Sequence, residues 1–312
     1  MAETFHTLIA RNKRNSILLI GVFLILFVAL GVAVGMVWGD GNLYFAGAVA
    51  CIAAAVAFVM TLASYYGGAG ALLLMSRARE IRKEDDPQLF NVVEEMCIAG
   101  GLPMPRIYLI EDSAMNAFAT GRNPRHAAVA ITTGLRQKLA RDELQGVMAH
   151  ELSHVRHYDI LYATLMAVMV GVLVMLSHVF LRSLWFGGGR RRRRSSSRGG
   201  GGGGAAQIVI LLAALLLAIL APFLAKIVQM ALSRQREYLA DAGAVELTRN
   251  PEGLASALAR LSGDQEVLEV ANGATAPLYI VHPIKKFEER SSNIFSTHPS
   301  IEDRIRRLMQ LR

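Results

Sequence analysis

The chain has 312 residues, 53% of them hydrophobic, and carries a formal net charge of +8. This apolar fraction is higher than ordinary soluble domains contain, so the composition favours a membrane protein. With only two cysteines the chain has neither a disulfide framework nor a cysteine zinc site, and any metal must be bound by histidine and carboxylate side chains.

Four uncharged apolar runs are long enough to span a bilayer, for which a helix needs about 20 residues. They cover residues 17–38, 43–75, 160–181 and 205–225. The first run is too long for a signal peptide and lacks a small-residue cleavage site, so we expect it to be retained. Residues 1–75 are predicted to form a membrane hairpin with helices at about 17–38 and 43–68.

Basic residues flank this hairpin at both ends, whereas the link at 39–42 carries only an acid: Arg11, Lys13 and Arg14 come before it, and Arg77, Arg79, Arg82 and Lys83 follow it. By the positive-inside rule both ends face the cytoplasm. Residues 76–159 are therefore expected to form a cytoplasmic folded part.

The start of this part has clear helix signals. Asp86-Pro87 is an N-cap and first-turn pair, and Gly100-Gly101 ends the helix that follows. Short strands are predicted at 106–110, 116–120 and 126–132, because these segments are rich in strand-forming residues and bounded by turn residues.

A further helix is predicted to begin near Asp142, with Gln145 as its capping partner. It contains the sequence HELSH at 150–154. On a helix, His150 and His154 lie about 40° apart on one face, so both can bind one metal ion. Glu151 lies about 100° from His150, where it can act on a water without replacing it. The spacing is suited to zinc-dependent hydrolysis.

A catalytic zinc needs a third protein ligand. The segment EYLAD at 237–241 offers Glu237 as that ligand and Asp241 to orient a ligand histidine. Taken alone, this segment would more often be a surface helix with its acids paired to arginines. The flanking apolar runs favour the metal site, because a second membrane hairpin over 160–225 would bring HELSH and Glu237 together at the bilayer surface.

Residues 226–247 and the segment after Asn250-Pro251 are predicted helices, and Ser300 with Asp303 caps a final helix. The loop at 186–204 contains the block Arg190–Arg194 followed by glycines. The low-complexity composition of this segment favours a solvated loop, and contact with anionic lipid is the lesser alternative. No nucleic-acid partner is expected. An external arginine block conflicts with the positive-inside rule, so either the first hairpin dominates orientation or the second does not fully cross.

Four motifs together resemble the HtpX family of membrane-bound zinc metalloendopeptidases, gluzincins related to the CaaX prenyl endoprotease. They are HELSH, the E-x-x-x-D of EYLAD, MNAFATG at 115–121 and STHPSIEDRI at 296–305. The resemblance implies a mainly α fold with a small β-sheet, in which a protease domain is fused to about four transmembrane helices. Residues 76–159 and 226–312 would be the two parts of that domain, and one Zn²⁺ would bind per chain.

The resemblance also implies a role for each matching residue. The zinc ligands would be His150, His154 and Glu237, with Glu151 as general base and Asp241 in the outer shell. An edge strand would bind extended substrate through Asn116, Ala117, Phe118 and Ala119. His298 would stabilise the oxyanion as a hydrogen-bond donor. Arg304 matches the last motif without an assigned role.

The implied activity is cleavage of unfolded or damaged membrane proteins at the cytoplasmic side of a bacterial inner membrane, with self-cleavage in the arginine and glycine loop as a further expectation. Two alternatives use the same metal residues. A site-2-type intramembrane protease would embed HExxH in an apolar helix, but the residues before HELSH are polar. A metal transporter would place ligands within several membrane runs, which here contain only His178. His157 is expected to face solvent or bond locally, and His282 to be a loop residue.

Overall fold

The computed structural model describes residues 5–169, 171, 234–264, 266–270, 278–280 and 299–311. Its contacts divide the chain into two compact units. The αβ unit comprises Met1–Ser16, Ser64–Val168 and Gln229–Arg312, and the apolar unit comprises Ile17–Ala63 and Met169–Val228. Several predicted features lie outside the described residues: the run at 205–225, half of the run at 160–181, the loop at 186–204 with Arg190–Arg194, and His178, His282 and His298.

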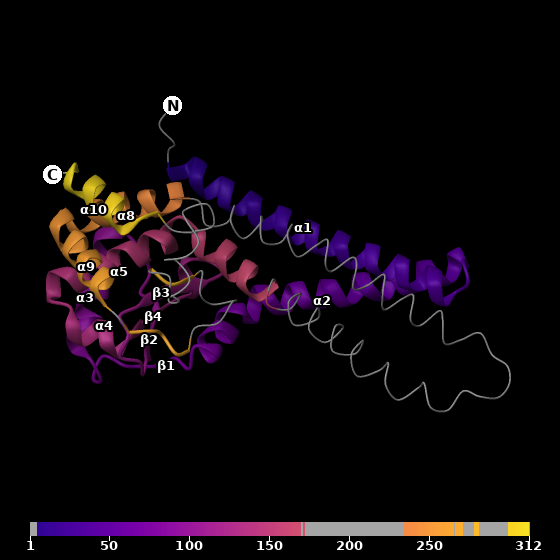
Figure 1. The fold of residues 1–312 in the computed structure, drawn as a ribbon, viewed down its shortest axis with the longest axis horizontal. Helices are drawn as coiled ribbons and strands as arrows, with labels where there is room; N and C mark the ends of the chain where they lie inside the picture. The colour runs from indigo at the N-terminus through magenta and orange to yellow at the C-terminus, as the bar shows by residue number, and fades with distance from the viewer. Residues whose placement is uncertain are drawn as a thin grey trace. The chain divides into compact units, whose positions relative to one another are not determined.

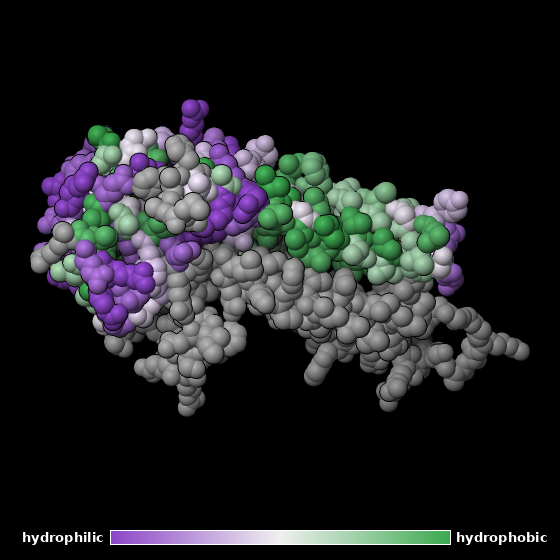
Figure 2. Space-filling model, turned by 90° about the horizontal axis from the view of Figure 1, so that it is seen from above, coloured by the Kyte–Doolittle hydropathy of each residue, from purple (hydrophilic) through white to green (hydrophobic). Residues whose placement is uncertain are grey.

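Two long helices contain the first two apolar runs. Helix α1 (Phe5–Trp38) begins twelve residues ahead of its run, and α2 (Leu43–Met75) continues to the end of its run. Within the described residues, these are the two helices long and apolar enough to cross a membrane. Many large apolar side chains along them are exposed, including Ile17 (69%), Ile25 (67%) and Ile52 (65%), and Figure 2 shows the hydrophobic surface that they form. Such a surface is stable in lipid, not in water.

Small residues let the two helices pack closely inside the apolar unit. A methyl group at Gly31 would lie 2.7 Å from Ala53 Cβ, and one at Gly35 would lie 2.5 Å from Ala46 Cα. The two glycines are four apart, which is the G-x-x-x-G spacing of closely packed membrane helices. Backbone contact of this kind replaces the hydrophobic driving force that lipid does not provide.

The αβ unit contains a four-stranded sheet in the order β1-β2-β4-β3 (Figure 1). The strands are β1 (Arg79–Glu80), β2 (Arg106–Ile110), β3 (Ala117–Gly121) and β4 (Ala127–Thr132). Strands β2 and β4 pair in parallel. Strand β1 pairs antiparallel to β2, and β3 pairs antiparallel to β4. The three predicted strands are therefore present, each within one residue of its expected position, and β3 lies at an edge.

Helices make up most of the rest of the described αβ unit. They are α3 (Pro87–Gly100), α4 (Thr133–Lys138), α5 (Arg141–Arg156), α8 (Arg234–Thr248), α9 (Pro251–Gly263) and α10 (Ile301–Met309). The predicted caps of α3, α9 and α10 are confirmed, because Asp86, Asn250 and Ser300 each accept a backbone N–H. The protein is thus mainly helical with a small sheet, as the sequence predicts.

The predicted cap of α5 is wrong. The helix begins at Arg141, and the Glu143 carboxylate accepts the Ala140 N–H at 2.8 Å. Gln145 instead donates to the Glu95 carboxylate on α3 at 2.9 Å. Ala140 has no side-chain oxygen to cap the helix, so the Glu143 carboxylate in the first turn accepts the free backbone N–H. Gln145 does not cap the helix because it is hydrogen-bonded to Glu95 on α3.

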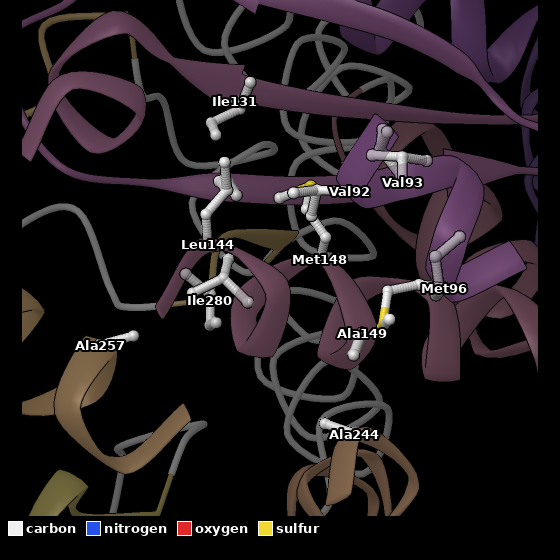
Figure 3. Close-up of a cluster of buried hydrophobic side chains, with 14 of the residues drawn as sticks. Val92, Val93, Met96, Ile131, Leu144, Met148, Ala149, Ala244, Ala257 and Ile280 are labelled. Atoms are coloured by element: carbon white, nitrogen blue, oxygen red, sulfur yellow. The ribbon is translucent and has the colours of Figure 1, made fainter. Parts of the chain in front are cut away.

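Helix α5 is the centre of the main hydrophobic core. It packs against α3, α8, α9 and β3, and Figure 3 shows Leu144, Met148 and Ala149 of this helix among side chains from the sheet and the other helices. Because α5 is buried on several sides, its polar side chains are buried as well, and each needs a partner inside the protein.

Two glycines set how closely other helices approach α5. A methyl group at Gly146 of α5 would lie 2.6 Å from the Leu254 backbone nitrogen on α9. One at Gly243 of α8 would lie 2.2 Å from Ser153 Oγ on α5. The second contact lets α8 lie directly against the HELSH face of α5.

Gly146→Ala is expected to lower the free energy of unfolding of the αβ unit by about 1–3 kcal/mol, because the added methyl meets backbone that cannot rotate away. The midpoint of thermal unfolding in detergent measures the change. Gly263→Ala is the matched control, since no atom lies within 4 Å of a Cβ at the last residue of α9. Equal midpoints for the two variants would contradict the close packing of α9 on α5.

Candidate metal centre

Three side chains from two helices meet at the contact of α5 with α8. His150 Nε2 lies 3.6 Å from Glu237 Oε2, and His154 Nε2 lies 3.7 Å from Glu237 Oε1. The two imidazole rings are perpendicular, with centroids 4.8 Å apart. Each residue offers one ligand atom, and these atoms all lie within 4.8 Å of one another. The helix spacing places both histidines on one face, as predicted, and the packing of α8 brings in Glu237.

This donor set fits zinc. A tetrahedral zinc with ligands at about 2.1 Å holds its ligand atoms roughly 3.4 Å apart, close to the 3.6 and 3.7 Å separations between Glu237 and the two histidines. Two imidazole nitrogens and one carboxylate are the protein ligands of a catalytic zinc, which keeps a fourth position for water or substrate. His150, His154 and Glu237 therefore form a zinc-binding site.

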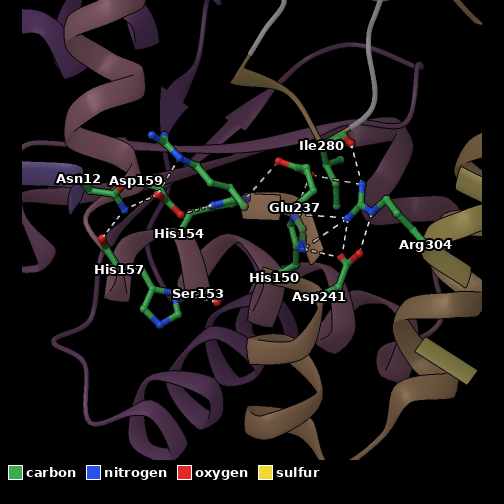
Figure 4. A network of polar contacts seen from close by, with 11 residues as sticks. Asn12, His150, Ser153, His154, His157, Asp159, Glu237, Asp241, Ile280 and Arg304 are labelled. Carbon is green, nitrogen blue, oxygen red and sulfur yellow. Dashed lines mark hydrogen bonds and ion pairs between the residues drawn. The ribbon is translucent and has the colours of Figure 1, made fainter. Parts of the chain in front are cut away.

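The other ring nitrogen of His150 faces Asp241. His150 Nδ1 lies 3.0 Å from Asp241 Oδ1, and a proton on Nδ1 leaves Nε2 for the metal (Figure 4). Asp241 is one turn after Glu237 on α8, so one helix supplies both a ligand and the group that orients another ligand. The carboxylate–histidine pairing predicted from EYLAD is present.

Arg304 on α10 closes this side of the site. Its guanidinium donates to both oxygens of Asp241, from Nε at 2.9 Å and from Nη2 at 2.7 Å. Its Nη1 lies 3.5 Å from Glu237 Oε2 and donates to the Ile280 carbonyl at 3.3 Å. The side chain is 1% exposed. Arg304, to which the resemblance assigned no role, is thus a buried residue that binds both carboxylate oxygens of Asp241.

His154 has a carboxylate partner that the sequence reasoning missed. Its Nδ1 lies 3.1 Å from Asp159 Oδ2, so both histidines have the same kind of outer-shell partner. Helix α5 ends at Arg156, and Tyr158 adopts a left-handed conformation with φ of 62° before Asp159 begins the next helix. No spacing rule in the sequence indicates this contact, because it depends on the direction of that turn.

Burial and neighbouring charges shift the acid–base equilibria of the metal-free site. Burial by itself lowers the pKa of His150, but hydrogen bonds to Asp241 and Glu237 raise this pKa to about 9. Burial raises the pKa of the Glu151 carboxyl, against the opposing effect of His150 and His154. Burial alone would also raise the pKa of Asp241, but the charge of Arg304 lowers it. Asp241 is therefore the anionic partner of His150, whereas the Glu151 carboxyl protonates more readily than an ordinary glutamate.

Glu151 lies beside the metal ligands and is 2% exposed. Within the described part of the chain its carboxylate makes no hydrogen bond or ion pair with another side chain. His157, in contrast, is buried and turned toward Ser153, with 3.4 Å between its Nδ1 and Ser153 Oγ. It bonds locally, which was one of the two predicted situations.

The predicted substrate-binding residues lie at or beside the edge strand β3. Asn116 precedes the strand and is held to β4, because its carbonyl accepts the Thr132 N–H at 3.0 Å. The Ala117 carbonyl points away from β4 and accepts the Ile280 N–H at 3.0 Å. By the alternation of an antiparallel pair, the N–H and C=O of Ala119 also point outward. His298 lies outside the described residues.

Comparisons with known proteins agree with this site. The family model of Peptidase family M48 matches residues 83–312. The chain is 45% identical over 303 residues to the protease HtpX homolog of Streptococcus mutans, covering 97% of this chain and 98% of that protein. It is 43% identical over 308 residues to the protease HtpX homolog of Dictyoglomus thermophilum, covering 99% and 95%.

A likeness among solved structures is the crystal structure of S. mikatae Ste24p, with a TM-score of 0.49 and 18% identity, covering 96% of this chain and 66% of that chain. The family match covers the zinc-binding residues, and the alignment with the HtpX homologs extends over the apolar helices as well. The chain therefore belongs to peptidase family M48, as an HtpX-type membrane zinc metalloprotease.

Proposed function

We propose that this metalloprotease cleaves unfolded or damaged membrane proteins at the cytoplasmic face of a bacterial inner membrane, as a step of protein quality control. The observation that carries the proposal is the buried Glu151 carboxylate beside the cluster of His150, His154 and Glu237, in a unit that continues directly into apolar helices. The metal histidines lie on α5, which is not among the apolar helices, and this argues against the intramembrane and transporter alternatives.

Glu151 is proposed as the general base. When bound, zinc would supply Lewis acidity that polarises a peptide carbonyl and acidifies a water. Glu151 would accept the proton of that water and later deliver a proton to the leaving amine. The raised pKa of the Glu151 carboxyl in its buried position supports this role, because a carboxyl that holds its proton more firmly is a better base near neutral pH.

Substrate would add to the outer edge of β3 as an extended strand. The Ala117 carbonyl is already bonded to Ile280, so the outward N–H and C=O of Ala119 are the groups that we expect to bind substrate backbone. His298 is proposed to donate a hydrogen bond to the developing oxyanion. Asn116 and Phe118, whose backbone groups turn toward β4, would shape the strand without contacting substrate backbone.

We further propose that residues 1–75 and 160–225 are two membrane hairpins, so that four helices span the bilayer, and that 76–159 and 226–312 together form the cytoplasmic protease. An active site next to the bilayer raises the effective concentration of membrane-anchored substrates. Cleavage within the chain's own loop at 186–204 is part of the same proposal, since an unfolded segment near the site would be a substrate.

Glu151→Gln is expected to lower the rate of casein cleavage by about 10²- to 10⁴-fold, the usual contribution of a general base. The purified protein is assayed in detergent after zinc loading, with metal content measured in parallel. Both forms should bind one zinc, because Glu151 is not a ligand. Equal cleavage by the two forms would show that Glu151 is not the base.

Arg304→Lys is expected to weaken zinc binding roughly tenfold, because lysine keeps the charge but cannot hold both Asp241 oxygens, and changes in outer-shell partners cost about 10- to 100-fold. Competition with a chromophoric chelator measures the dissociation constant. Arg306→Lys is the matched control on α10, since the Arg306 side chain is 68% exposed and pairs at the surface with Asp303. If the Arg304→Lys protein has the same zinc dissociation constant as the parent protein, Arg304 does not position His150 through Asp241.

The proposed orientation can be tested with single cysteines in a protein whose Cys51 and Cys97 are replaced by alanine. Tyr44→Cys, at the exposed start of α2, should react with a membrane-impermeant maleimide in intact spheroplasts. Glu84→Cys, at an exposed position before α3, should react only after permeabilisation. The reverse pattern would place the metal centre on the outer side.

A further inference from the structure

The zinc ligand His154 is connected to the first membrane helix by a short chain of hydrogen bonds. His154 Nδ1 lies 3.1 Å from Asp159 Oδ2. The other oxygen of this carboxylate, Oδ1, accepts Asn12 Nδ2 at 2.5 Å. Figure 4 shows Asn12, Asp159 and His154 in this sequence. Asn12 belongs to α1, and it is 145 residues away from His157 in the sequence.

Asn12 is buried and bonded twice. The residue is 2% exposed, and the same Nδ2 group donates to the His157 carbonyl at 2.9 Å. A buried amide group costs free energy unless it is hydrogen-bonded, so the burial of Asn12 among the polar residues at the start of α1 is tied to these contacts. One amide group thus holds both the backbone of the turn and the carboxylate that follows it.

The turn that Asn12 holds is conformationally constrained. Tyr158 has a φ of 62°, a left-handed conformation that is unfavourable for a residue with a side chain. It packs beneath Lys13, whose Nζ lies 4.3 Å from the Tyr158 ring centroid. Two neighbouring residues of α1, Asn12 and Lys13, therefore both contact the turn, and this turn decides whether Asp159 can reach His154.

Asp159 has one further charged neighbour. Arg236 Nε on α8 lies 3.7 Å from Asp159 Oδ1, and the Arg236 guanidinium lies over the Tyr162 ring at 4.8 Å. Asn12 and Arg236 thus share one oxygen of the carboxylate, and the other oxygen faces His154. Loss of Asn12 would leave the charge of Asp159 compensated but its position less restrained.

We propose that Asn12 is a positioning residue for the zinc ligand His154, acting through Asp159, so that the first membrane helix is a structural part of the metal centre. Helix α1 contributes its residues 5–16 to the αβ unit and its residues 17–38 to the apolar unit. Binding free energies are reciprocal, so zinc binding must in turn stabilise the docking of the start of α1. The inference concerns zinc affinity and requires only the zinc site, not the proposed proteolytic mechanism.

The test measures zinc affinity of the full-length protein in detergent, in a Glu151→Gln background that prevents self-cleavage. Asn12→Ala should raise the zinc dissociation constant about tenfold, and Asp159→Ala at least as much, within the usual range for outer-shell changes. Ser16→Ala is the matched control: it is equally buried and one turn later, and its hydroxyl bonds to the Asn12 carbonyl. It should leave the dissociation constant unchanged.

A double-mutant cycle decides whether Asn12 acts through Asp159. If it does, Asn12→Ala should have no added effect on zinc affinity in the Asp159→Ala protein. A general loss of folding would instead lower affinity in both backgrounds. An unchanged dissociation constant for Asn12→Ala, or independent effects of the two substitutions, would overturn the proposal.

Hydrogen exchange of the Glu151→Gln protein keeps the proposal testable even where Asn12→Ala fails to fold. Zinc loading should slow amide exchange in the first turns of α1, over residues 7–16, as reciprocity requires. The mid-membrane part of α1, over residues 20–30, serves as the internal control and should not change. Equal exchange of residues 7–16 with and without zinc would overturn the proposal. If zinc protects residues 7–16 but the parent protein cleaves no substrate, the proposed function is contradicted and the proposal for Asn12 is not.

Discussion

The metal centre depends on charge compensation between buried side chains. Glu237 and Asp241 are buried carboxylates on one helix, and removing such a charge from water costs several kcal/mol unless it is paired. Arg304 contacts both of them, and His150 lies between them. The helices that carry these residues must therefore pack in one relative position. A divalent ion would add positive charge to the same cluster.

The same arrangement occurs on both sides of the site. Each zinc-binding histidine turns its Nδ1 toward a carboxylate, which fixes the tautomer that leaves Nε2 for the metal. Asp241 is held by Arg304 from the C-terminal helix α10, and Asp159 is held by Asn12 from the N-terminal helix α1. Segments from opposite ends of the chain thus meet at one metal centre, although its ligands come from α5 and α8.

Local rules account for much of what the sequence predicted. The helix repeat places His150 and His154 on one face, and the caps at Asp86, Asn250 and Ser300 follow from single side chains bonding to nearby backbone. The strands at 106–110 and 127–132 follow from residue type and flanking turns. The capping partner of α5 was predicted wrongly, because Gln145 has a tertiary partner on α3 that no local rule includes.

Residue types and their spacing were sufficient to indicate a membrane-anchored chain, a helix with two metal histidines, and a glutamate and aspartate one turn apart that suit the same ion. These inferences need only the helix period and the length of a membrane span. The tertiary fold decided which side chains support the ligands: Arg304 behind Asp241, Asp159 behind His154, and Asn12 behind Asp159. Such contacts join residues up to 147 positions apart. They depend on helix packing and on a left-handed turn at Tyr158, and neither has a signature in the order of the residues.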